Sequence, residues 1–189
     1  MDALDAIQTR RTIGRLIEPA PGETALARAF EAAVAAPDHK RLRPWRFLVI
    51  EGDGRKELGT LMAKALKSER PDVSEADLER ESGKPMRAPM IIAVVAKIDA
   101  GSKIPEVEQT LATGAATQNL MLALHAQGFG TAWKTGGSSY SPIVRDGLGL
   151  ANGDKIIGFI YAGSASSVPP PATPANWRDY VSAWSGPAR

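Results

Sequence analysis

Met90-Ile91-Ile92-Ala93-Val94-Val95-Ala96 decides the fold, because this uninterrupted apolar run predicts the strongest strand of the chain. Neither alternate set of its side chains is polar, so both faces of the strand must be covered by other elements. A long helix is predicted next, from Pro105 to about Gln127, before Gly128. From Ala112 to Ala126 this helix is apolar almost all round, which is typical of an interior helix or a subunit interface.

The remaining elements follow from shorter patterns. A helix with Leu4 and Ile7 on one face ends near Arg10, and another opens at Gly22 and stops before Pro37. Further helices are predicted at 55–66 and 142–148, and strands at 47–50, 130–133 and 156–161. Residues 67–88 are highly charged, which favours a mobile, partly helical excursion that could close as a lid over a ligand.

Composition limits the class of protein. A chain of 189 residues suits one domain, spanning 1–189. The absence of cysteine excludes disulfides and thiol catalysis, and His39 and His125 alone make a metal site improbable. A net charge of +2 gives no case for nucleic-acid binding. The chain has no stretch long and apolar enough for a membrane span and no signal-peptide pattern, so we expect a cytoplasmic protein.

The C-terminal segment is rich in proline. Prolines between residues 168 and 174 predict an extended arm, because each fixes φ and removes a backbone donor. Trp177, Tyr180, Val181 and Trp184 follow at helical spacing. These side chains must be buried somewhere, either on the core of the same chain or on a second subunit.

Arg10-Arg11-Thr12 is the most suggestive polar motif, because two guanidiniums and a hydroxyl suit the binding of a phosphate group. A second basic cluster follows at residues 39–46 and could converge on the same ligand. Taken alone, the arginine pair could also be a solvated turn, which is the usual environment of arginine.

Together these motifs carry a family resemblance. Arg10-Arg11-Thr12 with Arg15-Leu16 resembles the opening of the nitroreductase family, and Pro37-Asp38-His39 with Arg43-Pro44-Trp45-Arg46-Phe47 resembles its next conserved block. Residues 116–136 resemble the central helix and following strand of that family, including Gly130-Thr131-Ala132-Trp133. The order and spacing of these blocks extend across nearly the whole chain.

The resemblance implies an α+β fold, with a mixed central sheet flanked by helices. It also implies a homodimer with exchanged C-terminal arms and two FMN sites, each built from both chains, with NAD(P)H as reductant. Small members of the family carry an arginine at the position of Ala35, which has no side-chain donor here. The residues that would contact FMN are Arg10, Arg11 and Thr12 at the phosphate, His39 from the partner chain, and Trp133, Lys134 and Thr135 along the flavin.

The implied chemistry needs no catalytic residue from the protein, because hydride moves directly to and from the flavin N5 atom. Lys134 is a candidate for tuning the flavin, since a cation stabilises its reduced form. We expect ping-pong transfer from NAD(P)H to a nitroaromatic, quinone or enone. A non-catalytic flavin carrier or sensor is one alternative, and a small basic nucleic-acid-binding protein is another. Gly128-Phe129-Gly130 follows a helix rather than a strand, so it does not predict a Rossmann fold.

Overall fold

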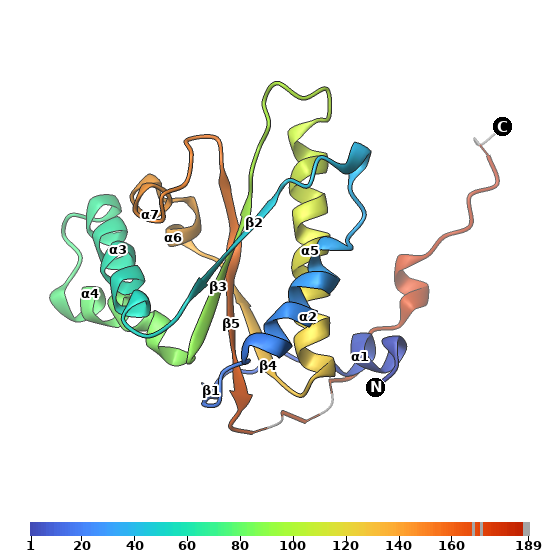
Figure 1. Cartoon of the computed structure of the whole chain (residues 1–189), viewed down its shortest axis with the longest axis horizontal. Coiled ribbons are helices and arrows are strands. Elements are labelled where there is room, and N and C mark those ends of the chain that lie inside the picture. The colour runs from blue at the N-terminus through green and yellow to red at the C-terminus, as the bar shows by residue number, and fades with distance from the viewer. Residues whose placement is uncertain (168, 171, 187–189) are drawn as a thin grey trace.

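A sheet runs through the middle of the protein with helices on both sides (Figure 1). The computed structural model describes residues 1–167, 169–170 and 172–186. The helices are α1 (Ala3–Thr9), α2 (Glu23–Val34), α3 (Gly54–Glu69), α4 (Glu75–Ser82), α5 (Glu106–Ala126), α6 (Gly137–Tyr140) and α7 (Pro142–Gly147). The strands are β1 (Leu16–Ile17), β2 (Trp45–Ile50), β3 (Met90–Ala96), β4 (Gly130–Lys134) and β5 (Lys155–Ala165). Short 3-10 turns are η1 (His39–Arg41), η2 (Lys84–Arg87) and η3 (Trp177–Tyr180).

The sheet has the order β1-β5-β3-β2, with β4 also paired to β5. Each of these strand pairs is antiparallel, which corrects the prediction of a mixed sheet. The reason is the position of β5, which pairs with β3 and β4 on opposite edges and so separates these two strands. Within the described residues, the parallel contact is a single bridge between Thr12 and Thr131.

Strand β3 lies at the centre of two apolar cores, as the sequence predicts. Ile91, Ala93 and Val95 face the core under α3 and α7. Met90, Ile92 and Val94 face the core under α2 and α5. Each β3 residue has 0% exposure, so both faces of the strand are covered. This explains why its sequence does not alternate between apolar and polar residues.

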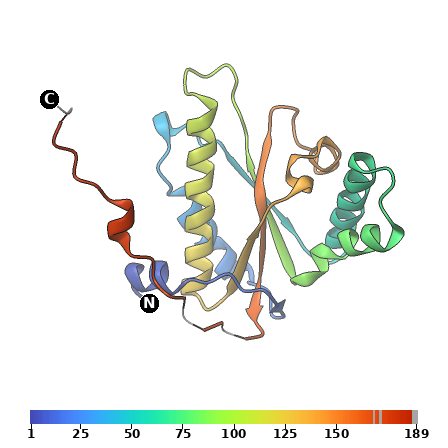
Figure 2. The ribbon, with the colours of Figure 1, turned by 180° about the vertical axis from the view of Figure 1, so that it is seen from behind.

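Helix α5 packs on α2 over one face of the sheet (Figures 1 and 2). Its buried stripe includes Ala116, Leu120 and Leu124, and the Asn119 amide donates a hydrogen bond to the Ala32 carbonyl of α2 at 3.1 Å. Val107 and Leu111, near its start, are 62% and 67% exposed. The helix is therefore interior on one side, while apolar side chains remain uncovered on the other.

The charged excursion at 67–88 is partly helical, as predicted, and its second half packs against the body of the protein. Pro85 and Ala88 are buried, and the Arg55 guanidinium of α3 donates to the Ala88 carbonyl at 2.6 Å. The absence of a side chain at Gly59 lets α3 approach the end of α4, since a Cβ there would lie 2.1 Å from the Ser82 carbonyl oxygen. The sequence does not predict this packing, because the charged residues of the segment indicate a solvent-exposed surface.

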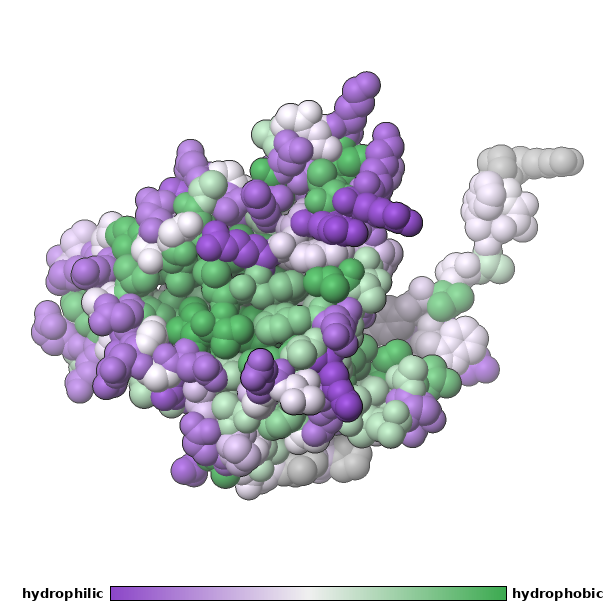
Figure 3. Space-filling view, in the orientation of Figure 1, coloured by the Kyte–Doolittle hydropathy of each residue, from purple (hydrophilic) through white to green (hydrophobic). Residues whose placement is uncertain are grey.

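The C-terminal arm leaves the body after β5 and projects clear of it in the space-filling view (Figure 3). Trp177 and Tyr180 lie in a 3-10 turn, η3, and Trp184 lies beyond it, so these residues do not form the continuous helical stripe suggested by their spacing. Trp177, Tyr180 and Trp184 are 59%, 80% and 84% exposed, so they do not dock on the core of their own chain. Positions 168 and 171 of the predicted extended segment lie outside the described residues.

Candidate cofactor site

The segment that follows α1 is held against strand β4. The Ile13 backbone N–H donates to the Thr131 carbonyl at 3.0 Å, and Thr12 forms the parallel bridge to Thr131. Gly130 permits this approach, because a Cβ on it would lie 2.7 Å from Leu16 and 2.9 Å from Ile13. The structure thus holds the end of the Arg10-Arg11-Thr12 motif against β4, the strand that ends at Lys134.

Arg10 and Arg11 form a positive group without a counter-ion in the described part of the chain. The Arg11 Nη1 atom donates to the carbonyls of Gln8 and Arg10, at 2.7 Å and 2.9 Å. The Arg10 Nη1 and Arg11 Nε atoms are buried and lack a hydrogen-bond partner among the described residues. Buried donors without partners are costly, so this turn favours an acceptor from a ligand.

A cavity of about 260 Å³ has a lining that begins with the two residues after Thr12 and does not include Arg10, Arg11 or Thr12 themselves. Ile13 and Gly14, which follow Thr12, form part of its wall. Lys134 and Thr135 at the end of β4 form another part, together with residues from η2, α4, α6 and β5. Lys84, Arg87 and Lys134 contribute positive charge to the lining and Glu81 contributes negative charge, so the wall is cationic on balance.

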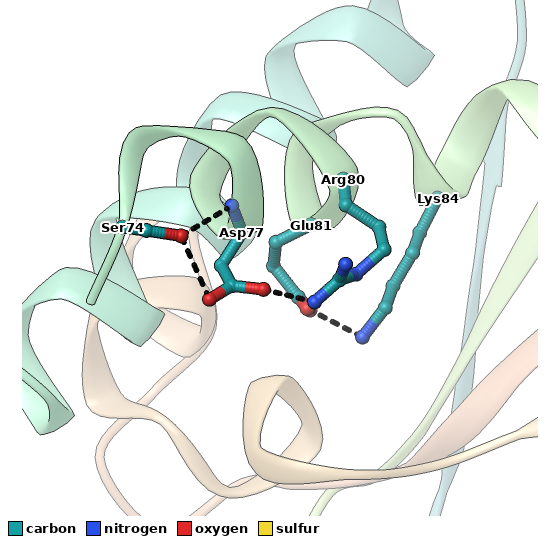
Figure 4. Close-up of polar contacts among 5 residues, drawn as sticks. All are labelled: Ser74, Asp77, Arg80, Glu81 and Lys84. Atoms are coloured by element: carbon teal, nitrogen blue, oxygen red, sulfur yellow. Dashed lines mark hydrogen bonds and ion pairs between the residues drawn. The ribbon is translucent and has the colours of Figure 1, made fainter.

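The end of α4 and the residues after it line the cavity through Glu81 and Lys84 (Figure 4). Ser74 caps this helix by accepting from the Asp77 backbone N–H at 3.2 Å, and Asp77 pairs with Arg80. One turn later, Glu81 accepts from the Lys84 ammonium at 2.5 Å. This pairing fixes two of the charged residues that line the cavity, because the Glu81 side chain is only 14% exposed.

Tyr161 and Ser139 add neutral hydroxyl groups to the cavity lining. Burial raises the pKa of Tyr161 to about 12, with smaller effects from Arg87 and Glu81. Its phenol therefore stays protonated at neutral pH and can donate a hydrogen bond. The Ser139 Oγ atom is buried without a partner among the described residues, so it too could satisfy a polar ligand atom.

His39 lies at the opposite end of α5 from the arginine pair. Its Nδ1 atom is 2.7 Å from Glu108 Oε2, near the start of α5, whereas His125 near the end of α5 contacts Thr9. A rise of 1.5 Å per residue places Glu108 and His125 about 25 Å apart along the helix axis. One protomer therefore does not bring His39 to the Arg10 end of the site.

The turn that carries His39 is strained. Lys40, Arg41 and Arg43 have positive φ angles of 58°, 56° and 52°, in the left-handed region that residues with a side chain rarely adopt. The Asp38 carboxylate accepts from the Arg43 backbone N–H at 2.5 Å and closes this turn. Strained backbone of this kind persists where its surroundings hold it, often at functional sites.

Trp133 faces away from the cavity. Its indole Nε1 donates to the Ile157 carbonyl at 3.2 Å, and the ring packs with the core under α2 and α5. Ala132 and Lys134, its neighbours on β4, line the cavity instead, as the alternation of a strand requires. The structure thus joins Lys134 and Thr135 to the site and leaves only the Trp133 backbone near it.

Sequence reasoning missed part of the cavity wall. Glu81, Lys84, Arg87, Ser139 and Tyr161 were not among the predicted site residues, nor was Glu108 as the partner of His39. Lys84 and Arg87 directly precede the strongest predicted strand, and this position is the sequence feature that could have placed them near a site at the end of that strand. The remaining residues carry no such signal, because the chain brings them together from distant elements.

This fold and site define an α+β protein with a cationic turn and a cavity beside one strand of its sheet. The chain belongs to the nitroreductase family, whose model matches residues 7–164. It is 41% identical over 164 residues to the "Putative NAD(P)H nitroreductase YdjA" of Escherichia coli K12, covering 87% of this chain and 88% of that protein. Within the described residues, no helix is long and apolar enough to cross a membrane.

Solved structures share the fold over nearly the full chain. The nitroreductase-like family protein from Bacillus cereus superposes with a TM-score of 0.84 at 25% identity, covering 98% of this chain and 97% of that one. The protein from Desulfovibrio desulfuricans described as "a putative nitroreductase in complex with fmn" has a TM-score of 0.76 at 25% identity, with 99% of each chain covered. The predicted family and the α+β class of its fold are therefore confirmed.

Proposed function

We propose that this protein is an FMN-dependent oxidoreductase that takes hydride from NAD(P)H and passes it to an organic acceptor. The observation that carries this proposal is the Arg10–Arg11 turn, whose buried Nη1 and Nε donors lack partners among the described residues, and which leads through Thr12, bridged to β4, into the cavity wall at Ile13. Support comes from membership of the nitroreductase family, from the NAD(P)H named in its Escherichia coli relative and from the FMN in the Desulfovibrio structure.

The residues present fit the phosphate end of FMN. Arg10 Nη1 and Arg11 Nε are charged donors that lack a partner among the described residues, and Thr12 adds an exposed hydroxyl group. Lys134 and Thr135 line the adjoining cavity and would hold the ring end, with the Trp133 backbone beside them. Lys134 would orient the ring and favour negative charge on it, although lysine lacks the bidentate fork of arginine.

Bound FMN supplies two-electron chemistry that amino-acid side chains lack. The protein's own task is to bind and orient the cofactor beside the cavity and to admit its substrates. A nitroaromatic, quinone or enone acceptor and NAD(P)H would use one open face in turn, which predicts ping-pong kinetics. No protein residue is proposed as a proton-transfer catalyst.

We propose that the working unit is a homodimer of single-domain protomers. Its interface would cover the apolar side chains that the protomer leaves exposed, including Leu4, Ile7, Val107 and Leu111. The C-terminal arm, with Trp177 and Trp184, would reach the partner. Such a dimer would also bring His39 of one chain to the Arg10 end of the other. A cytoplasmic location stays a prediction from the sequence.

The experiment that tests this proposal is anaerobic reduction of the purified protein. We expect a yellow protein with the visible spectrum of bound flavin, which bleaches on addition of NADH or NADPH and recovers with a quinone or a nitroaromatic compound. A non-catalytic carrier or sensor would stay yellow with both nicotinamides. A colourless protein that binds DNA with strong salt dependence would instead support the nucleic-acid alternative.

A further inference from the structure

His125, near the end of α5, lies beside the arginine turn and has no role in the proposed reaction. Its Nε2 atom is 2.9 Å from the Thr9 hydroxyl, one residue before Arg10. That hydroxyl donates its single proton to the Asp5 carbonyl at 2.5 Å, so the imidazole Nε2 must be the donor in its bond to Thr9. Nδ1 is therefore the nitrogen that gains or loses a proton.

Positive charge dominates the surroundings of this ring. Burial and then the charges of Arg10 and Arg11 lower the pKa of His125 below its ordinary value. Helix α1 also carries Asp5 and is capped by Asp2, but both are exposed, and Asp2 accepts from the Asp5 backbone N–H at the other end of that helix. Helix α2 meets this end of α5 through Gln127, which donates to the Ala25 carbonyl at 3.2 Å. The charged side chains of α2 are exposed, namely Glu23, Arg28 and Glu31.

We propose that His125 is a proton-linked residue of the anion site formed by Arg10, Arg11 and Thr12. A phosphate monoester bound at this turn would draw a proton onto Nδ1, and the imidazolium would become a third positive group beside the two guanidiniums. The inference rests on the proposed function, because the ligand it names is the phosphate end of the cofactor. Inorganic phosphate carries the same chemistry and serves as a smaller probe.

The direction of the effect follows from charge. Without ligand, two guanidiniums oppose protonation of the ring, and a bound dianion reverses this effect. The His125 pKa therefore rises on binding, because the bound anion stabilises the imidazolium. By linkage, phosphate affinity increases as pH falls through the interval between the two pKa values, by about tenfold for one unit.

The direct test follows the two imidazoles, His39 and His125, by NMR across their titration range. The protein is measured alone, with inorganic phosphate and with FMN. His125→Gln assigns the His125 resonance and still offers an amide donor to Thr9 without a titrating charge. We expect the His125 pKa to rise with both ligands. An unchanged pKa with FMN bound would overturn the inference, and this readout uses the wild-type protein.

A second measurement compares FMN and riboflavin affinities of wild type and His125→Gln across the same pH range. Protonation of the FMN phosphate itself affects both proteins equally, so the difference between them isolates the imidazole. FMN should gain about tenfold more affinity at low pH in wild type than in the variant, whereas riboflavin should show no difference. Equal pH slopes for FMN would reject the role of His125 alone. Equal binding of FMN and riboflavin by wild type would reject the phosphate site and the role of His125 with it, whereas the proposed oxidoreductase function fails only if NADH and NADPH do not bleach the bound flavin.

Discussion

Replacing Arg10 with alanine should weaken FMN binding much more than riboflavin binding. Arg10 has a buried Nη1 atom without a protein partner and forms no ion pair within the described residues, so its loss breaks no bond that holds the fold. A hydrogen bond to a charged group contributes about 1.5–3 kcal/mol. Since about 1.4 kcal/mol corresponds to a factor of ten, the loss in FMN affinity should be about ten- to a hundredfold.

The assay is a titration of apoprotein with each flavin, followed by quenching of flavin fluorescence. Arg28→Ala is the matched control, because Arg28 is an exposed arginine of α2 and its loss changes the net charge by the same amount. This control should bind both flavins as wild type does. Equal losses for FMN and riboflavin in Arg10→Ala would refute the reasoning and make the arginine turn a solvated surface feature.

Three further predictions concern packing, assembly and titration. Gly59→Ala should destabilise the protein by about 1–3 kcal/mol in urea unfolding, because its Cβ would meet the Ser82 carbonyl oxygen at 2.1 Å. Gly114→Ala should not destabilise the protein, because nothing lies within 4 Å of the added Cβ. Equal stability of the two variants would contradict the packing of α3 against α4. Removing residues 169–189 should weaken dimerisation and FMN retention together, as measured by sedimentation and absorbance, and a truncated protein that stays dimeric and yellow would exclude that role for the arm. Tyr161 should titrate near pH 12 in ultraviolet absorbance, a late phase that Tyr161→Phe removes. Because its folded pKa is raised from 10.0, stability should fall as pH rises from about 10 to about 12, and a phase at the ordinary value would argue against its burial.

The central elements could be predicted from the sequence because their composition is decisive. The apolar residues of β3 permit no exposed face, and α5 is bounded by Pro105 and Gly128. The pairing of strands could not be predicted in this way, because it depends on β5 inserting between β3 and β4 from much later in the chain. The prediction of a mixed sheet was wrong for this reason.

The site was predictable where its residues are close in sequence and hidden where they are not. Arg10, Arg11 and Thr12 form one motif, whereas Glu108 meets His39 from 69 residues away. Lys84 belongs to a segment whose charges resemble a solvated surface. Trp133 and Lys134 are neighbours on β4, so the alternation of a strand places the Trp133 side chain on the opposite face, away from the cavity.

The length of α5 has a genetic consequence. This helix holds His39 and Arg10 at opposite ends of one protomer, so in the proposed dimer each site takes Arg10 from one chain and His39 from the other. Substitutions of these two residues on different chains therefore fall in the same site. Homodimers of Arg10→Ala and of His39→Ala each carry two damaged sites. A mixed dimer of the two variants would place both lesions in one site and leave the other wild type. Co-expression should therefore restore one functional site in each mixed dimer through interallelic complementation, whereas the two homodimers stay inactive.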